Sequence, residues 1–380
     1  MLSELHKNNV FVDTVGHDVF DGGDGDDTAI YLFKSSPLRI TLSGPDDSTV
    51  YVGGVAEDTL RNIEDIVGGV DNDILTGDAK GNILFGMSGN DHLRGEDGPD
   101  QLEGGSGRDT IDGGSGVDWA SYRDKGLPVH AALSGANNST VYVGGVAEDT
   151  IRNIESIQGG ANKDVLTGDD KDNGLIGMAD DDSLYGEGGA DKLQGNGGKD
   201  FLDGGDGVDW ALYKDKQARV SVELSEYGDS TVYIGGVAED TLRNIESLQG
   251  GTRNDYLIGN SQDNTLEGRE GPDMLLGKGG SDQFLYTDAS HGDDIIWDFT
   301  RHEGDKISLD LLSHTQEDQE LSFIRQRPEP FSVWYTITRD GGGNHYTRIK
   351  ADTDGDEHTT EFIITLIGRF SLTEDDFILA

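Results

Sequence analysis

The clearest pattern in the chain is a single apolar residue that recurs at every ninth position among polar residues and glycines. From Gly68 the chain reads GGVDNDILT, GDAKGNILF, GMSGNDHLR, GEDGPDQLE, GGSGRDTID and GGSGVDWAS. Related blocks start at Gly159 and Gly250, and GGDGDDTAI starts at Gly22. The shared pattern is Gly-Gly-x-Gly-x-Asp-x-apolar-x. One apolar side chain between two outward-facing neighbours predicts a strand of three residues.

The glycines of each nonapeptide predict sharp turns between these short strands. Glycine permits positive φ and close approach of the backbone, so six residues can reverse the chain. Two nonapeptides then make one flattened coil of 18 residues, and stacked coils form two parallel sheets around a thin apolar interior. The predicted fold is all-β: tandem parallel β-rolls, which are right-handed β-helices, followed by a C-terminal β-rich domain.

A longer repeat contains the short one. STVYVGGVAEDTLRNIE from Ser48 returns almost unchanged from Ser139 and again from Ser230, at offsets of 91 residues. The stretches from Gly16, Gly107 and Gly198 keep the same register. The chain is therefore a tandem array, and it opens in the middle of a unit. We expect it to be the C-terminal part of a longer protein.

The segments between the nonapeptide blocks alternate apolar and polar residues, as in the stretch Val220–Leu224. They predict strands, including a hairpin that caps a roll. The following VAEDTLRNIE is compatible with a short helix or with an irregular coil of the solenoid. Its glutamate, at positions 64, 155 and 246, is either a calcium ligand or a solvated side chain.

Composition raises the question of what holds such a chain together. The net charge is −45, and 33% of the residues are hydrophobic. Such values are typical of disorder unless bound cations neutralise the charge, and the strict periodicity favours cations. The acidic balance argues against nucleic acid and anionic membranes as partners. No apolar run is long enough for a transmembrane helix, and the absence of cysteine excludes disulfides and thiolate metal sites.

The aspartate at position six of the nonapeptide is the predicted metal ligand. Turns one coil apart are stacked, so two such carboxylates converge with backbone carbonyl oxygens. An all-oxygen, flexible cage suits Ca²⁺ better than Mg²⁺ or Zn²⁺. Bare stacked carboxylates would instead repel each other. The predicted ligands are Asp27, Asp73, Asp91, Asp100, Asp109, Asp118, Asp164, Asp182, Asp191, Asp200, Asp209, Asp255, Asp273 and Asp282.

Each ligand is expected to pair with the one that lies 18 residues away. The predicted pairs are Asp73–Asp91, Asp91–Asp109, Asp100–Asp118, Asp164–Asp182, Asp182–Asp200, Asp191–Asp209 and Asp255–Asp273, with weaker pairs Asn82–Asp100 and Asn264–Asp282. Residues 68–121 carry 11 acidic and 3 basic side chains, and four calcium ions would balance that excess. Departures from glycine at position four, such as Asp71 and Lys171, weaken the sites early in a block.

The nonapeptide rhythm stops after Asp282, and alternating segments such as PFSVWYTITRD predict a terminal β domain. Asp352, Asp354 and Asp356 either bind one more ion or form a polar turn. The expected division of the chain is a partial roll at 1–34, a linker at 35–67, a roll at 68–121, a linker at 122–158, a roll at 159–212, a linker at 213–249, a roll at 250–285 and a C-terminal domain at 286–380.

These motifs resemble a known family. The nonapeptides are similar to the RTX, or haemolysin-type, calcium-binding repeats of parallel β-helices. SDQFLYTDAS, DDIIWDFTRHEGDKISL and LTEDDFILA resemble the C-terminal region of serralysin-type metalloproteases. The resemblance implies export by a type I secretion machinery through an uncleaved C-terminal signal, and folding on Ca²⁺ outside the cell. The expected location is therefore extracellular, which fits an N-terminus without the apolar core of a secretory signal.

No catalytic motif is found in the sequence. His302-Glu303 is followed by Gly304 rather than by a second zinc-binding histidine, and no Gly-x-Ser-x-Gly elbow occurs. The preferred hypothesis is a non-catalytic calcium-dependent scaffold or adhesin, with extracellular polysaccharide or a cell surface as a potential partner. The alternatives are an accessory region of an extracellular protease, lipase or alginate epimerase, and a fragment of a pore-forming toxin.

Overall fold

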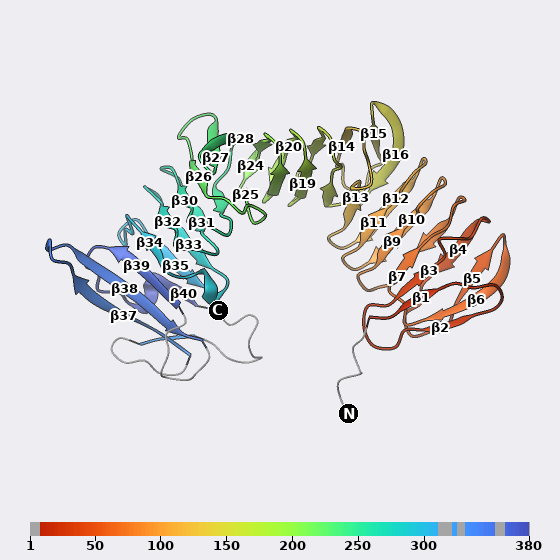
Figure 1. Ribbon diagram of the computed structural model, residues 1–380, viewed down its shortest axis with the longest axis horizontal. Coiled ribbons are helices and arrows are strands. Elements are labelled where there is room, and N and C mark those ends of the chain that lie inside the picture. Colours follow the sequence, from red (N-terminus) through yellow and green to blue (C-terminus); the bar gives the residue numbers. More distant parts are fainter. Residues whose placement is uncertain (1–7, 311–320, 325–330, 354–361, 380) are drawn as a thin grey trace. The chain divides into compact units, whose positions relative to one another are not determined.

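The computed structural model describes residues 8–310, 321–324, 331–353 and 362–379, and it divides into two compact units, residues 1–191 and 192–380. In both units, short strands alternate between two sheets, sheet A and sheet B (Figure 1). The described residues contain no α-helix and only two turns of 3-10 helix, η1 (Ala289–His291) and η2 (Glu374–Asp376). None of their helices is long and apolar enough to cross a membrane.

In the first unit, sheet A is wholly parallel. Its strands follow the order β1 (Val10–Val12), β3 (Thr28–Ile30), β7 (Asp65–Val67), β9 (Ile83–Phe85), β11 (Gln101–Glu103), β13 (Trp119–Ser121), β17 (Ser156–Gln158) and β19 (Gly174–Ala179).

Sheet B of the first unit mixes parallel pairs with two antiparallel insertions, β6–β5–β4 and β16–β15–β14. Its strands follow the order β2 (Val19–Asp21), β6 (Val55–Arg61), β5 (Ser48–Val52), β4 (Leu38–Thr41), β8 (Ile74–Thr76), β10 (His92–Asp97), β12 (Thr110–Ser115), β16 (Val146–Arg152), β15 (Ser139–Val143), β14 (Val129–Ala132), β18 (Val165–Thr167) and β20 (Ser183–Tyr185).

The second unit repeats this plan. Sheet A contains β22 (Lys192–Gly197), β25 (Trp210–Leu212), β29 (Ser247–Gln249), β31 (Thr265–Glu267), β33 (Gln283–Tyr286), β35 (Lys306–Leu309) and β40 (Phe377–Leu379). Sheet B contains β23 (Phe201–Asp203), β28 (Val237–Arg243), β27 (Ser230–Ile234), β26 (Val220–Glu223), β30 (Tyr256–Ile258), β32 (Met274–Leu276), β34 (Asp294–Ile296), β39 (Phe362–Ile367), β38 (His345–Asp352), β37 (Ser332–Arg339) and β36 (Ser322–Phe323).

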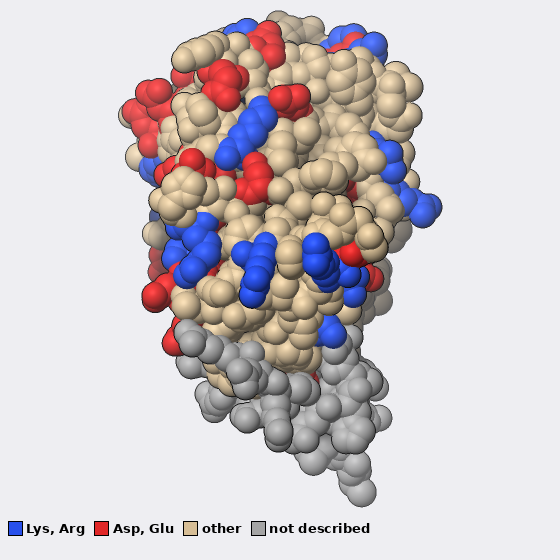
Figure 2. Space-filling view, turned by 90° about the vertical axis from the view of Figure 1, so that its left-hand side faces the viewer, with Lys and Arg blue, Asp and Glu red and all other residues tan. Residues whose placement is uncertain are grey.

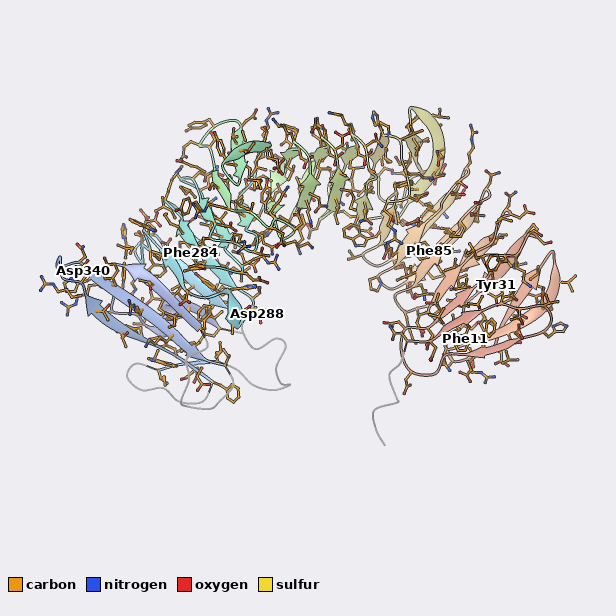
Figure 3. All side chains as sticks on the ribbon, viewed as in Figure 1. Phe11, Tyr31, Phe85, Phe284, Asp288 and Asp340 are labelled. Atoms are coloured by element: carbon orange, nitrogen blue, oxygen red, sulfur yellow. The ribbon has the colours of Figure 1, made fainter. Side chains whose placement is uncertain are left out.

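The register confirms the predicted 18-residue coil. Ile74 pairs with His92 in sheet B, and Ile83 pairs with Gln101 in sheet A. The apolar residue at position eight lies between the sheets, since Leu75, Leu84 and Leu102 are fully buried. In the second unit Phe284 takes the same kind of place (Figure 3). The predicted all-β fold of parallel β-rolls is therefore the observed one.

The segments between the nonapeptide blocks contribute strands to both sheets. In the first of them, β4 pairs in parallel with β8, β6 pairs with β2, and β7 lies between β3 and β9. Each segment is thus one coil that has been widened by a β-hairpin, and we call residues 31–67, 122–158 and 213–249 the wide coils. The helical alternative for VAEDTLRNIE is wrong, because strand β6 and its counterparts β16 and β28 cover most of it. Buried residues, Asp58 and Leu60, alternate with more exposed neighbours in β6, which is the pattern of a strand with one buried face.

The C-terminal part of the second unit ends in the antiparallel hairpin β37–β38, which joins sheet B through β39. Its inward residues, such as Val333 and Ile349, are fully buried. Figure 2 shows several Lys and Arg side chains close together on a face at this end of the chain. Basic residues are otherwise outnumbered, since the chain has 29 of them against 74 acidic ones.

Candidate calcium sites

All predicted aspartates of the nonapeptides are buried within the stacked turns. None of the fourteen side chains has more than 2% of its surface exposed. Each stands two residues before the apolar residue that faces the interior, so the strand fixes its position and the glycine turn fixes its direction. Burial of this kind is rare for aspartate unless the carboxylate has a partner.

In twelve of these aspartates, one carboxylate oxygen accepts a hydrogen bond from a backbone N–H of the coil that precedes it. The Asp91 Oδ1 atom accepts a hydrogen bond of 2.8 Å from the backbone N–H of Asp73, 18 residues earlier. The same bond links further position-six residues, with the donor named first: Asn82–Asp100, Asp91–Asp109, Asp100–Asp118, Asp164–Asp182, Asn173–Asp191, Asp255–Asp273 and Asn264–Asp282. The structure therefore brings these neighbours together. The predicted pairs Asp182–Asp200 and Asp191–Asp209 join different units and stay predictions.

The second oxygen faces a space that only glycine leaves open. A Cβ atom built on Gly86 would lie 2.5 Å from Asp91 Oδ2 and 2.6 Å from the carbonyl oxygen of Gly104, one coil further on. In the second unit, a Cβ on Gly250 would meet Asp255 Oδ2 at 2.5 Å and the Gly268 carbonyl oxygen at 2.6 Å. A carboxylate oxygen and a carbonyl oxygen from successive coils thus point at the same place.

Many of these second oxygens have no hydrogen-bond partner within the part of the chain that the structure describes. An unpartnered buried carboxylate oxygen is costly, and a cation is the usual compensation. The donor set is entirely oxygen, which suits Ca²⁺. The residues present therefore fit the ion. The buried Oδ2 atoms without a partner include those of Asp27, Asp91, Asp100, Asp109, Asp118 and Asp273.

Electrostatics point the same way. Burial raises the pKa of Asp91 and of Asp100 to about 7, and repulsion from the stacked carboxylates adds to the shift. Burial and repulsion from Asp294 raise the pKa of Asp273 to about 9. Without a cation the ionised form is therefore disfavoured in the folded chain, whereas a divalent ion between the turns would favour it.

Several residues that the sequence reading missed occupy the same place in the stack. Asp149 Oδ1 accepts from the Asp109 N–H at 2.8 Å, and Asp58 and Asp240 do the same for Asp18 and Asp200. Asp294 and Asp305 continue the stack above Asp273 and Asp282. All five precede a buried apolar residue by two positions, which is the spacing of the nonapeptide. This spacing could have identified the five residues from the sequence.

The glutamates of the wide coils take the place of aspartate. Glu64 Oε2 accepts from the Asp27 N–H at 3.1 Å, and Glu155 and Glu246 accept in the same way from Asp118 and Asp209. The other oxygen of Glu64 forms an ion pair of 2.7 Å with Lys80. Of the proposed C-terminal cluster, Asp352 is buried in β38, whereas Asp354 and Asp356 lie outside the described residues.

Comparisons with known proteins agree with this geometry. The RTX calcium-binding nonapeptide repeat matches in four copies, at residues 7–30, 63–93, 85–120 and 176–211. The C-terminal region of peptidase M10 serralysin matches residues 196–379. Fold and repeats together define a secreted protein that binds several calcium ions. The chain carries RTX calcium-binding nonapeptide repeats and a C-terminal region of the serralysin type.

Similarity to whole proteins is lower. No curated protein matches the chain. Among solved structures, the crystal structure of extracellular lipase LipA from Serratia marcescens matches with 15% identity and a TM-score of 0.22. The match covers 81% of this chain and 40% of the lipase chain, so the chain spans less than half the length of that solved protein.

Proposed function

We propose that the position-six aspartates, together with Asp58, Asp149, Asp240, Asp294 and Asp305, hold calcium ions between successive coils. The observation that carries this proposal is the unpartnered Oδ2 atom that faces a carbonyl oxygen of the next coil, as at Asp91 and Gly104. We also propose that the chain is divided into rolls and linkers as the sequence predicts, and that each linker forms one wide coil. The role of the protein would be that of a non-catalytic extracellular scaffold or adhesin.

Folding would depend on calcium because the interior is thin and the carboxylates repel one another. Metal that binds only the folded state converts binding energy into folding energy. In the calcium-poor cytosol the chain would stay unfolded and ready for export, and at about 1 mM calcium outside the cell it would fold. The serralysin-type region at 196–379 supports export by a type I route.

Circular dichroism with calcium and with EGTA tests the proposal. The expected result is a coil-like spectrum in EGTA and a β spectrum in millimolar Ca²⁺, with several ions bound per chain by isothermal titration calorimetry. Mg²⁺ at the same concentration is the control, and it should not replace Ca²⁺, because it demands a tighter octahedral site. A β spectrum that is unchanged by EGTA would contradict the proposal.

A second candidate function is an accessory region of an extracellular enzyme, and the match to the serralysin C-terminal region favours it. In that case the chain should raise the thermal stability or the yield of a catalytic domain to which it is fused. Fusion of this chain to a serralysin-type protease domain, with export measured from a type I secretion host, separates the two functions. Equal export and activity with and without the chain would contradict the accessory role and favour the scaffold role.

A further inference from the structure

We propose that a lysine takes the place of a calcium ion between two stacked turns, once in every 91 residues. The lysines are Lys34, Lys125 and Lys216, one in each wide coil. This inference rests on the proposed calcium sites, because it concerns a gap of the same kind between successive turns. In the wide coil, the ammonium group of the lysine occupies this gap.

The turn that contains Lys125 differs from the turns of the nonapeptides. It reads SYRDKGLP from Ser121, and it has no glycine-rich run and no aspartate at position six. Val129 follows it and donates its N–H to Asp164 Oδ1 at 2.7 Å, as a position-six residue would do. The turn that contains Lys125 is therefore part of the stack of turns. It offers no carboxylate at position six, however, that could bind an ion between this turn and the preceding glycine turn, which contains Gly105.

The Lys125 side chain extends into that gap. Its ammonium group donates to the carbonyl oxygen of Gly105, which belongs to the glycine turn 20 residues earlier, and to Glu148 Oε1 at 2.6 Å. Lys125 is only 8% exposed. Such burial of a lysine is rare without an anionic partner. The ammonium thus binds a backbone carbonyl of the lower turn and a carboxylate of the wide coil, which are the two kinds of oxygen that surround the proposed ions.

The full arrangement recurs at Lys216, and its ion pair with a glutamate of the wide coil also recurs at Lys34. Lys216, also 8% exposed, donates to the carbonyl oxygen of Asn196 and to Glu239. Lys34 forms ion pairs with Glu57 at 2.6 Å and with Asp13 at 3.0 Å. Because the lysine recurs at the same position of each 91-residue unit, we interpret it as a regular part of the wide coil and not as an isolated surface ion pair.

The lysine also faces the carboxylates that continue the stack through the wide coil. The Oδ2 atoms of Asp109 and Asp149 are buried and have no hydrogen-bond partner among the described residues. One ammonium thus neutralises part of the charge at a place where a calcium ion would supply two positive charges.

The test compares three variants of the full chain by calcium titration, with circular dichroism as the readout. Lys125→Met removes the buried charge, Lys125→Arg keeps it, and Lys163→Met removes an exposed charge that pairs with Asp181 and, at 3.7 Å, with Asp180. For Lys125→Met we expect the calcium midpoint to rise about fivefold, because a buried carboxylate loses its partner. Lys125→Arg should stay within about twofold of the natural chain because it keeps the positive charge. Lys163→Met should do so because exposed ion pairs contribute little.

Ion counting by native mass spectrometry provides the second readout. Lys125→Ser opens the gap while Gly105, Glu148 and Asp149 remain, so the variant should bind one more Ca²⁺ than the natural chain. An unchanged ion count, or equal midpoint shifts for Lys125→Met and Lys163→Met, would overturn the inference. Absence of any calcium-dependent transition in the natural chain would instead contradict the proposed function, so the two failures are distinguishable.

Discussion

The glycine at position one of the nonapeptide offers a direct way to fill a proposed calcium site without changing any charge. In Gly86→Ala the new methyl group would lie 2.5 Å from Asp91 Oδ2 and 2.6 Å from the Gly104 carbonyl oxygen. Both distances are shorter than a carbon–oxygen contact allows, so the methyl group occupies the space between the two oxygens. We therefore expect one calcium site to be lost.

The magnitude follows from linkage. For a site with a dissociation constant of about 10⁻⁴ M, binding contributes about 1.4 kcal/mol at about 1 mM Ca²⁺ and about 2.7 kcal/mol at about 10 mM. The destabilisation of Gly86→Ala should therefore grow by about 1.3 kcal/mol over this tenfold rise in calcium. A steric clash alone would cause a loss that is independent of calcium.

Urea unfolding at the two calcium concentrations, followed by tryptophan fluorescence, measures this difference. Gly126→Ala is the matched control, because a Cβ atom at Gly126 meets no atom within 4 Å. The control should change the free energy of unfolding by only a few tenths of a kcal/mol, with no dependence on calcium. A loss in Gly86→Ala that is the same at both calcium concentrations would refute the reasoning.

Three further predictions follow from the same geometry. In EGTA the chain should gain β structure as the pH falls from about 8 to about 5. The reason is that burial raises the pKa of Asp91 and of Asp100 in the folded chain to about 7. The metal-free fold is therefore most stable below the pKa of these groups in the unfolded chain, and it loses that stability as the pH rises through about 7. Loss of structure on acidification in EGTA would contradict this prediction. Asp100→Asn should reduce the number of bound ions seen by native mass spectrometry, whereas Asp206→Asn, at an exposed position, should leave it unchanged. Asp149→Asn should raise the calcium midpoint in a dichroism titration as much as Asp91→Asn does, and a shift no larger than that of Asp206→Asn would exclude Asp149 from the stack.

Much of the roll could be predicted because its information is local. The nonapeptide itself carries the turn, the ligand and the core residue, so the pairing of Ile74 with His92 follows from counting 18 residues. The same reasoning placed Leu75 and Leu84 inside. The match between local pattern and global structure is typical of repeat proteins, in which each coil contacts only its neighbours.

The wide coils could be predicted only in part because their pairing is non-local. Alternation in the segment from Leu38 to Thr41 predicts a strand, but nothing in it says that this strand joins β8 in parallel. Asp58 could have been found from its spacing to Leu60. Lys125 could not, because its contact with Gly105 depends on how the wide coil stacks on the turn below.

The most direct test of calcium between the coils is a crystal structure of the chain grown in millimolar Ca²⁺, with anomalous scattering used to locate the ions. We expect an anomalous peak between Asp91 Oδ2 and the Gly104 carbonyl oxygen, and equivalent peaks at the other stacked aspartates. No peak is expected at the Lys125 ammonium. Ordered turns without any peak beside Asp91, Asp100 and Asp109 would contradict calcium binding between the coils.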